Sequence, residues 1–151
     1  MIFYRLERLP RGTAAEAFSG EGGRHYAMRW NSVGTRLVYT STSTALACLE
    51  TLVHMQNWHV PQERWVFSVD VPDRLVEELR PLPRGWDEEP AGAASRVAGD
   101  KWVSELRSVA LLVPSVVIPA EMNALINPEH PQFRLTWVQK PMRFRFDPRL
   151  R

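Results

Sequence analysis

Three residues with chemically versatile side chains lie about ten positions apart in the first third of the chain. Arg29, Tyr39 and Glu50 lie within RWNSVGTRLVYTSTSTALACLETLVH, among residues that otherwise suit ordinary folding. A guanidinium binds anions, a phenol offers a ring and a hydroxyl, and a carboxylate stabilises positive charge. Each also has a plain interpretation, as a surface cation, a packed strand residue and a solvated helix residue. The residues alone leave both interpretations open.

A second group of polar residues follows an apolar run. Ser115 comes directly after Pro114 at the end of VALLVP, and Asn123 and Asn127 follow it a few positions later. Polar groups at the end of a buried strand often point into a site. Serine after proline and asparagine before proline are also common in turns, so the same pattern equally predicts turn residues.

Several motifs that would indicate other chemistry are missing. The stretch GEGGRH at residues 20–25 ends in histidine where a dinucleotide-binding loop needs glycine, and no phosphate-binding G-x-x-x-x-G-K-[ST] occurs. The four histidines form no H-E-x-x-H pattern, and the single Cys48 cannot build a thiolate zinc site. We therefore expect no metal and no bound cofactor, with Cys48 a small buried apolar residue.

Composition limits the class of protein. A length of 151 residues with 44% apolar content predicts one domain spanning residues 1–151. The formal charge of +2, from 19 basic and 17 acidic residues, is no sign of direct nucleic-acid binding. The N-terminus MIFYRLERLP lacks the order of a signal peptide, and the longest apolar run falls short of the ~20 residues of a membrane helix. We expect a cytoplasmic protein that does not enter the membrane.

Hydrophobic periodicity predicts a mixed α/β (α+β) domain with five or six strands. Alternating apolar and polar residues indicate half-buried strands, and the continuous run VALLV indicates a buried one. The predicted strands are residues 2–7, 36–41, 65–71, 109–113 and 142–147.

The main predicted helix carries Glu50. It begins at Ser43 or Thr44, either of which can cap it, and runs to about Trp58. Its apolar stripe, expected to pack on the sheet, consists of Ala45, Leu49, Leu52 and Val53. Glu50 lies on a flank of that stripe, which it shares with Ala47 and His54. Shorter helices are expected at residues 73–79 and 93–107, joined by a surface loop at 80–94 that is rich in proline, glycine and charge.

Three stretches together carry a family resemblance. GEGGRHYAMRWNSVG, LVYTSTSTALACLETLVH and GDKWVSELRSVALLVPSVVIPAEMNALINPEHPQF resemble the RES domain, a family named for its Arg, Glu and Ser. The similarity covers most of the chain, and V-P-S followed by N-x-L-x-N-P-x-H-P is its most specific part. The family's Arg, Tyr, Glu and Ser correspond to Arg29, Tyr39, Glu50 and Ser115.

One departure from the family pattern is visible. Relatives tend to show Gly-Gly just before RWN, whereas this chain has Ala27 and Met28. Side chains at these positions keep a ligand further from the backbone than glycine would, so we expect an effect on substrate fit.

The resemblance implies a fold similar to ADP-ribosyltransferases and an enzyme that breaks the nicotinamide-ribose bond of NAD⁺. Arg29 is then expected at the pyrophosphate or a ribose, Tyr39 at the nicotinamide, and Glu50 at the ribose, where it stabilises an oxocarbenium-like charge. Ser115 completes the pocket by hydrogen bonding. The other expected substrate-binding residues are Trp30, Asn31, Asn123 and Asn127.

The resemblance also implies a role and a partner. The chain is expected to be the toxin of a bacterial toxin–antitoxin pair, degrading NAD⁺ as a hydrolase or, with inorganic phosphate as co-substrate, a phosphorylase. Its partner would be a helix-turn-helix, Xre-like antitoxin that silences it near Arg29 or Glu50, and it would reach DNA only through that antitoxin. A homo-oligomer is left open.

Two alternatives remain at this point. The first is an ADP-ribosyltransferase that modifies a protein. The second is a non-catalytic module that uses the arginine-rich FRFDPRLR near the C-terminus to bind nucleic acid or a partner.

Overall fold

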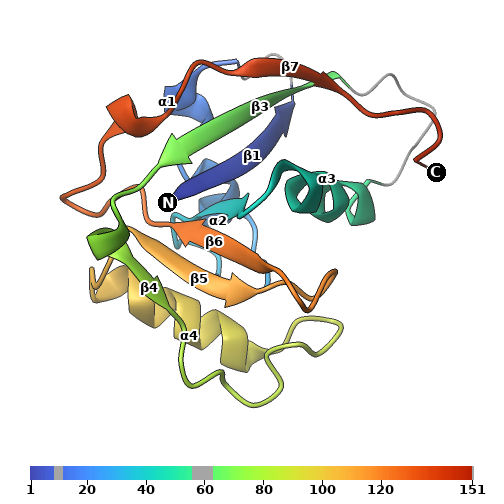
Figure 1. Ribbon diagram of the computed structural model, residues 1–151. Coiled ribbons are helices and arrows are strands. Elements are labelled where there is room, and N and C mark those ends of the chain that lie inside the picture. Colours follow the sequence, from blue (N-terminus) through green and yellow to red (C-terminus); the bar gives the residue numbers. More distant parts are fainter. Residues whose placement is uncertain (9–11, 56–62, 151) are drawn as a thin grey trace.

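The fold is built on a twisted, mixed β-sheet (Figure 1). The computed structural model describes residues 1–8, 12–55 and 63–150. In this part of the chain seven strands form one sheet in the order β4-β5-β6-β2-β1-β3-β7, in which β4 and β5 are parallel and the other neighbours antiparallel. The strands are β1 (Ile2–Arg8), β2 (Val38–Ser41), β3 (Glu63–Asp70), β4 (Val76–Glu78), β5 (Ala110–Pro114), β6 (Met122–Ile126) and β7 (Met142–Arg145).

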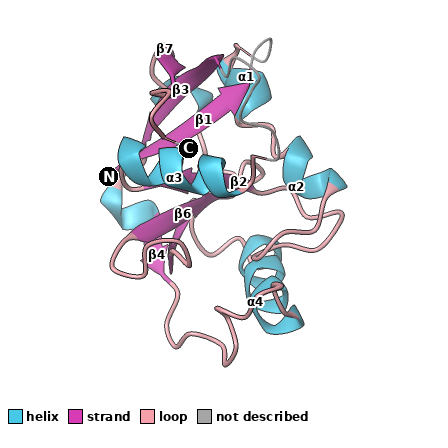
Figure 2. Cartoon of the chain, turned by 90° about the vertical axis from the view of Figure 1, so that its right-hand side faces the viewer, coloured by secondary structure: helices cyan, strands magenta, loops and turns pink. Residues whose placement is uncertain are grey.

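Four α-helices flank the sheet in the described residues. They are α1 (Ala14–Ala17), α2 (Glu21–His25), α3 (Thr44–Val53) and α4 (Ala93–Ser104). Figure 1 shows α4 lying along β4 and β5, while α3 lies beside β1 and β2, and Figure 2 shows the same arrangement from the side. Short 3₁₀ turns occur at Asp73–Leu75 and Leu135–Trp137.

Strand alternation gives the sheet two apolar faces with separate cores. Phe3, Phe67 and Val69 on one face pack with Phe18, which follows α1. On the other face, strand side chains pack against Trp102 of α4; this second core comprises Trp30, Leu37, Leu79, Trp102, Val103, Leu111, Val113 and Leu125. Because neighbouring side chains in a strand point to opposite faces, β2, β5 and β6 contribute to both cores, whereas β1 and β3 contribute to the first core.

All five predicted strands are present, with ends that shift by up to two residues, as β1, β2, β3, β5 and β7. Two further strands, β4 and β6, and the short helices α1 and α2 were not predicted. The predicted helix at residues 73–79 is wrong, because a 3₁₀ turn is followed at once by β4. Val76 pairs with Ala110 of β5, and this long-range pairing overrides the local preference.

The predicted helix at residues 93–107 ends earlier, at Ser104. Leu106 has a φ of 50°, which is incompatible with a continuing α-helix. The predicted loop at residues 80–94 is confirmed except at its end, where α4 begins at Ala93.

Helix α3 begins as expected but ends early and buries a different face. Ser43 caps it, its Oγ accepting from Leu46 N at 3.0 Å, and the helix stops at Val53; residues 56–58 of the prediction lie outside the described residues. The predicted stripe is half right: Leu52 is buried and Leu49 half-buried, whereas Ala45 and Val53 are exposed. The buried residues of the helix are Leu46, Ala47, Cys48 and Leu52. At about 100° per residue, Glu50 falls between Leu46 and Ala47, on the buried side of the helix.

No helix within the described ranges has the length and apolarity needed to cross a membrane.

Candidate functional site

Glu50 is held by hydrogen bonds from two other segments of the chain. Its Oε1 accepts from Ser115 Oγ at 2.7 Å and from Asn123 Nδ2 at 2.5 Å. Ser41 Oγ donates to Asn123 Oδ1 at 2.7 Å, which fixes the orientation of that amide. We call Ser41, Glu50, Ser115 and Asn123 the carboxylate cluster. Glu50 Oε2 accepts no hydrogen bond from the described residues.

Ser115 is placed by the end of β5. It is fully buried, and its Oγ accepts from Val117 N at 3.1 Å and Ile118 N at 2.9 Å while donating to Glu50. The turn prediction for Ser115 is therefore correct, yet the same hydroxyl also holds the carboxylate. With its acceptor capacity used by the backbone, the hydroxyl proton is directed to Glu50.

Arg29 lies against the loop at residues 80–92. Its Nη1 donates to the carbonyl oxygens of Trp86 and Glu88, both at 2.9 Å, and its Nη2 donates to Glu89 Oε2 at 2.8 Å. The Arg29 side chain is 16% exposed, whereas that of Glu89 is 79% exposed. The carbonyls orient a mostly buried guanidinium, and the solvent-exposed carboxylate of Glu89 binds its remaining N–H groups.

Tyr39 ties the backbone after Arg29 to the sheet. Its hydroxyl donates to Asn31 Oδ1 and accepts from Trp30 N, both at 2.9 Å. Burial raises the pKa of Tyr39 above its ordinary value, a shift that the hydrogen bond from Trp30 and the charge of Arg29 oppose. The phenol therefore stays protonated and keeps donating to Asn31.

Trp30 and Asn31 are engaged by the protein itself. Trp30 is buried and stacks on Trp86 with ring centroids 6.2 Å apart. Asn31 Nδ2 donates to the carbonyls of Gly23, Tyr26 and Ser32. Both residues position the segment that carries Arg29, and direct contact with a substrate stays a prediction for each.

The approach of α4 to this segment depends on Gly99. A Cβ at Gly99 would lie 1.8 Å from the carbonyl oxygen of Trp30, so only glycine permits the contact. Asp100, the next residue of α4, accepts from Ser32 N at 2.9 Å and Thr35 Oγ1 at 2.7 Å through its Oδ1.

The two groups of residues meet on one face of the sheet. Tyr39 pairs with Leu125 and Ser41 pairs with Asn123 in the antiparallel ladder of β2 and β6. Paired residues share a face, and residues two apart on a strand are about 7 Å apart. The segment around Arg29 and the carboxylate cluster are therefore anchored at neighbouring positions of β2, on the same face of the sheet.

Asn127 has a different role. It is fully buried, its Nδ2 donates to Val103 O at 3.3 Å, and its Oδ1 accepts from Glu129 N at 3.0 Å. The latter is the turn chemistry expected of asparagine before proline. These contacts tie the NPEHP turn to the end of α4, and substrate binding by Asn127 stays a prediction.

Ala27 and Met28, which stand where relatives tend to show Gly-Gly, are both exposed. Met28 N donates to Asn31 O at 3.0 Å, so the backbone here turns back on itself next to Arg29. The effect of the two side chains on substrate fit stays a prediction.

Metal and thiol chemistry find little support in the described residues. These contain no group of three or more His, Cys, Asp or Glu side chains that could hold a metal ion. Cys48 is buried in α3, and burial raises the pKa of its thiol, which disfavours the nucleophilic thiolate.

Sequence reasoning missed three contributors to this region. Ser41 follows Tyr39 by two positions in VYTS, so strand alternation placed both on the face that carries the site. Trp86 is an aromatic residue in an otherwise polar loop, a pattern that indicates a contact. For Glu89, one of several acidic residues in that loop, the sequence offers no distinguishing signal.

Comparison with known proteins shows which family the chain resembles. A family model described as "RES domain" matches residues 2–147. A protein of Sphingobium sp. (strain YBL2) named Prs ADP-ribosylating toxin is 41% identical over 153 residues, covering 98% of this chain and 95% of the relative. Toxin Res of Yersinia enterocolitica is 38% identical over 155 residues and covers 100% of both chains.

The fold also has a solved counterpart. A chain of the M. tuberculosis MbcT–MbcA toxin–antitoxin complex superposes with a TM-score of 0.69 at 16% identity, covering 99% of this chain and 85% of that one. This likeness confirms the mixed α/β architecture. The family-model match and the full-length relatives together show that this chain belongs to the RES domain family.

Proposed function

We propose that this RES domain protein is the toxin of a toxin–antitoxin pair and that it cleaves the nicotinamide-ribose bond of NAD⁺. Relatives that match nearly its whole length are named toxins, one of them an ADP-ribosylating toxin. An ADP-ribosylating enzyme must break this same bond before it transfers the ADP-ribosyl group. Cleavage of NAD⁺ is therefore common to every form of the proposal.

The observation that carries the proposal is the asymmetric holding of Glu50. One carboxylate oxygen is fixed by Ser115 and Asn123, at 2.7 and 2.5 Å, which leaves Oε2 for a ligand. Bond cleavage at a ribose C1′ builds up oxocarbenium-like positive charge. A carboxylate already held in place stabilises that charge without having to reorient during the reaction.

The proposed reaction needs one carboxylate and no acid. The C1′–N bond breaks and its electron pair stays with nicotinamide, which changes from a cation to a neutral molecule and needs no proton. Water then forms the new bond to C1′ and releases a proton, giving ADP-ribose. With inorganic phosphate as the nucleophile, the product is ADP-ribose phosphorylated at C1′.

Arg29 is the proposed anchor for the negative groups of NAD⁺. Its guanidinium is oriented by two carbonyls and already binds a carboxylate, that of Glu89. A pyrophosphate oxygen can take the place of this solvated carboxylate while the carbonyls continue to hold the arginine. Tyr39, whose hydroxyl is bound within the protein, contributes its ring.

Transfer of ADP-ribose to a protein is the second candidate. The Sphingobium relative, 41% identical, is named for ADP-ribosylation of Prs, so Prs is the acceptor to test first. In that case the same cleavage occurs, but a side chain of the acceptor protein attacks C1′ in place of water or phosphate.

The test is to incubate the purified protein with NAD⁺ and follow free nicotinamide by chromatography. Three reactions are compared: buffer alone, buffer with inorganic phosphate, and buffer with purified Prs. Release without an acceptor supports hydrolysis, release that depends on phosphate supports phosphorolysis, and release with labelled Prs supports protein modification. If nicotinamide is released in none of them, the proposed activity is wrong.

An antitoxin partner is proposed on related grounds, since the structural neighbour belongs to a toxin–antitoxin complex. The ion pair between Arg29 and Glu89 illustrates how an acidic group can occupy the proposed anion site. We expect a helix-turn-helix antitoxin to insert a carboxylate near Arg29 or to cover Glu50. A tight complex that still consumed NAD⁺ at the rate of the free protein would contradict this mode of inhibition.

A further inference from the structure

Asp100 is an acidic residue inside helix α4 that helix formation does not explain. Aspartate has a low helix propensity, and this one lies well within Ala93–Ser104. Its side chain is half-buried, and Lys101, its neighbour along the helix, pairs with Glu105 instead. Partial burial of a carboxylate is costly unless hydrogen bonds satisfy it. The partners of Asp100 therefore indicate why the residue is there.

Those partners lie in the segment of residues 29–35, which begins with Arg29. Asp100 Oδ1 accepts from Ser32 N at 2.9 Å and from Thr35 Oγ1 at 2.7 Å. Ser32 and Thr35 are the two ends of a tight turn, in which Thr35 N donates to Ser32 O at 3.2 Å. Hydrogen bonds to a charged acceptor are roughly twice as strong as those between neutral groups. One carboxylate oxygen thus ties both ends of this turn to α4.

The short side chain of Asp100 suits the close approach of the helix to this segment. At the neighbouring Gly99, a Cβ would lie 1.8 Å from the carbonyl oxygen of Trp30. With the helix backbone this near, the carboxylate of an aspartate reaches both donors. One further methylene group would displace the carboxylate from the position in which Ser32 and Thr35 bind it.

Strand β2 also holds the backbone that follows Arg29. Trp30 N donates to the Tyr39 hydroxyl at 2.9 Å. Burial is the main cause of the raised pKa of Tyr39, and the negative charge of Asp100 raises it further. Asp100 is therefore close enough to Tyr39 for its charge to act on the phenol, although it contacts a different part of the segment.

The guanidinium of Arg29 is oriented by yet another part of the chain. The carbonyl oxygens of Trp86 and Glu88 each accept from its Nη1 at 2.9 Å. The loop at residues 80–92 thus fixes the head of the arginine, whereas α4 and β2 fix its backbone. A shift of the backbone would move the guanidinium relative to Glu50, even with the loop in place.

From these contacts we infer that Asp100 is a positioning residue of the proposed site. It acts through Ser32 and Thr35 and holds residues 29–35 where the Arg29 guanidinium can bind the negative groups of NAD⁺. This inference rests on the proposed function, in which Arg29 is the anchor for NAD⁺. It assigns the role to the position of the Asp100 oxygen and not to its charge.

The test compares three substitutions in the purified full chain, with nicotinamide release measured over a range of NAD⁺ concentrations. Asp100→Asn keeps an oxygen in the place of Oδ1 without the charge, Asp100→Glu keeps the charge on a longer side chain, and Asp100→Ala removes both hydrogen bonds. We expect KM to rise at least about fivefold in Asp100→Glu and Asp100→Ala, with kcat within about threefold of wild type, because ground-state binding is lost. Asp100→Asn should keep KM within about twofold.

Two further measurements address the same contacts. Thr35→Val removes one donor and should raise KM by less than Asp100→Ala does, and adding it to Asp100→Ala should raise KM no further. By NMR, the amide of Ser32 should exchange its hydrogen at least about tenfold faster in Asp100→Ala than in wild type or Asp100→Asn. The amide of Leu46, bound to Ser43 Oγ in α3, should exchange at the same rate in all of them.

Val103→Ala is the control for lost stability. Val103 is buried in the same helix, and its apolar side chain forms none of the hydrogen bonds that hold residues 29–35. We expect Val103→Ala to lower the melting temperature by several degrees while KM stays within about twofold of wild type.

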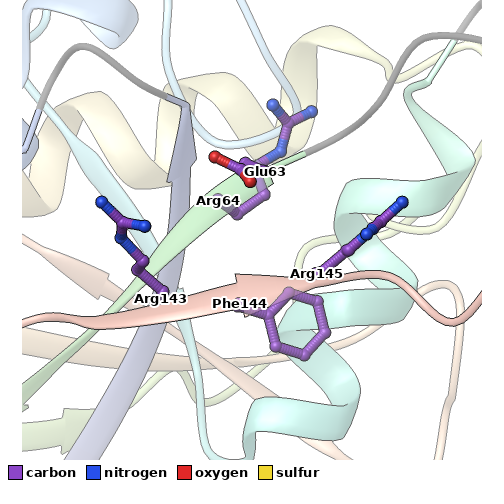
Figure 3. A pocket seen from close by; sticks show the side chains of 5 residues that line it. All are labelled: Glu63, Arg64, Arg143, Phe144 and Arg145. Atoms are coloured by element: carbon purple, nitrogen blue, oxygen red, sulfur yellow. The ribbon is translucent and has the colours of Figure 1, made fainter.

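A second control lies at the far end of the sheet, in a pocket of about 130 Å³ between β3 and β7 (Figure 3). In that pocket Arg64 pairs with Phe144, so it lies on the opposite face of the sheet from Arg143 and Arg145. These arginines cannot bind one anion together. Arg143→Ala should therefore leave both kinetic constants unchanged.

The possible failures are distinguishable. A wild type that released no nicotinamide would refute the proposed function, and the role of Asp100 would fall with it. If the wild type were active but Asp100→Glu and Asp100→Ala kept its KM, the positioning role alone would be refuted. The same holds if Asp100→Asn raised KM as much as Asp100→Ala, because the charge would then be the important feature, or if Val103→Ala did so, because stability would be.

Discussion

Glu50→Gln removes the proposed catalytic charge and leaves the surrounding contacts almost intact. The glutamine oxygen can take the place of Oε1 and accept from Ser115 and Asn123 as the carboxylate does. Hydrogen bonds to a charged acceptor are somewhat stronger than those to a neutral one, so we expect a stability loss of about 1 kcal/mol. For a chain of this size that lowers the melting temperature by roughly 2 to 4 °C.

The expected loss of activity is much larger. A unit charge about 4 Å from a developing positive charge contributes about 4 kcal/mol at an effective dielectric constant near 20. Because Glu50 is half-buried, we reduce this to about 3 kcal/mol, a decrease on the order of a hundredfold in kcat. The charge acts mainly in the transition state, so KM should change by no more than about threefold.

The assay measures nicotinamide release by wild type and variant at saturating NAD⁺, with NAD⁺ levels and growth followed in cells that express each protein. Glu121→Gln is the matched control, because it also neutralises a carboxylate that accepts from a serine, Ser43 Oγ at 3.2 Å. We expect the control to keep its activity within about threefold. A Glu50→Gln protein that released nicotinamide and arrested growth at the wild-type rate would refute the role assigned to Glu50.

Three further predictions concern the segment around Arg29. Glu89→Gln should lower KM for NAD⁺ about two- to threefold in steady-state assays, because it removes a competitor for the guanidinium; an increase in KM would contradict this. Tyr39→Phe should cost about 1 to 3 kcal/mol of unfolding free energy in urea titrations, because the amide of Trp30 loses its acceptor. Gly99→Ala should lower the melting temperature by several degrees, and a thermal shift assay that showed no change would refute the close packing of α4 on Trp30.

The sequence predicted strands well where their pattern was local. Alternation identified β1, β2, β3 and β7, and a continuous apolar run identified β5, so each of these strands carries its own hydrophobic signal. β4 is three residues long and includes two glutamates, and it exists because it pairs with β5. β6 contains Asn123, whose sequence context fitted a turn residue and a site residue equally well but not a strand; in the structure its amide donates to Glu50. Neither strand can be found without the partner that stabilises it.

The surroundings of Glu50 escaped prediction for a related reason. The helix sequence TALACLETLV is apolar on several sides, so more than one stripe was available, and the predicted stripe shares only Leu52 with the buried face. The position of the sheet decides that Leu46 and Ala47 face inward. Glu50 lies between these two residues around the helix axis, so it faces inward as well. The family resemblance pointed to Glu50 and Ser115 together, and the structure joins these two by a hydrogen bond. The contacts of Arg29 with a distant loop required the three-dimensional fold.

The carboxylate cluster joins residues that are synthesised at different times. Asn123 follows Glu50 by 73 positions, and β6 enters the sheet between β5 and β2. At about 5 to 20 residues per second, a ribosome needs roughly 4 to 15 s to add the intervening chain. During this interval the nascent protein carries its glutamate without the groups that hold it. Under the proposed function, the cell meets an active enzyme only after the chain has been synthesised past Asn123, which gives an antitoxin several seconds to be in place.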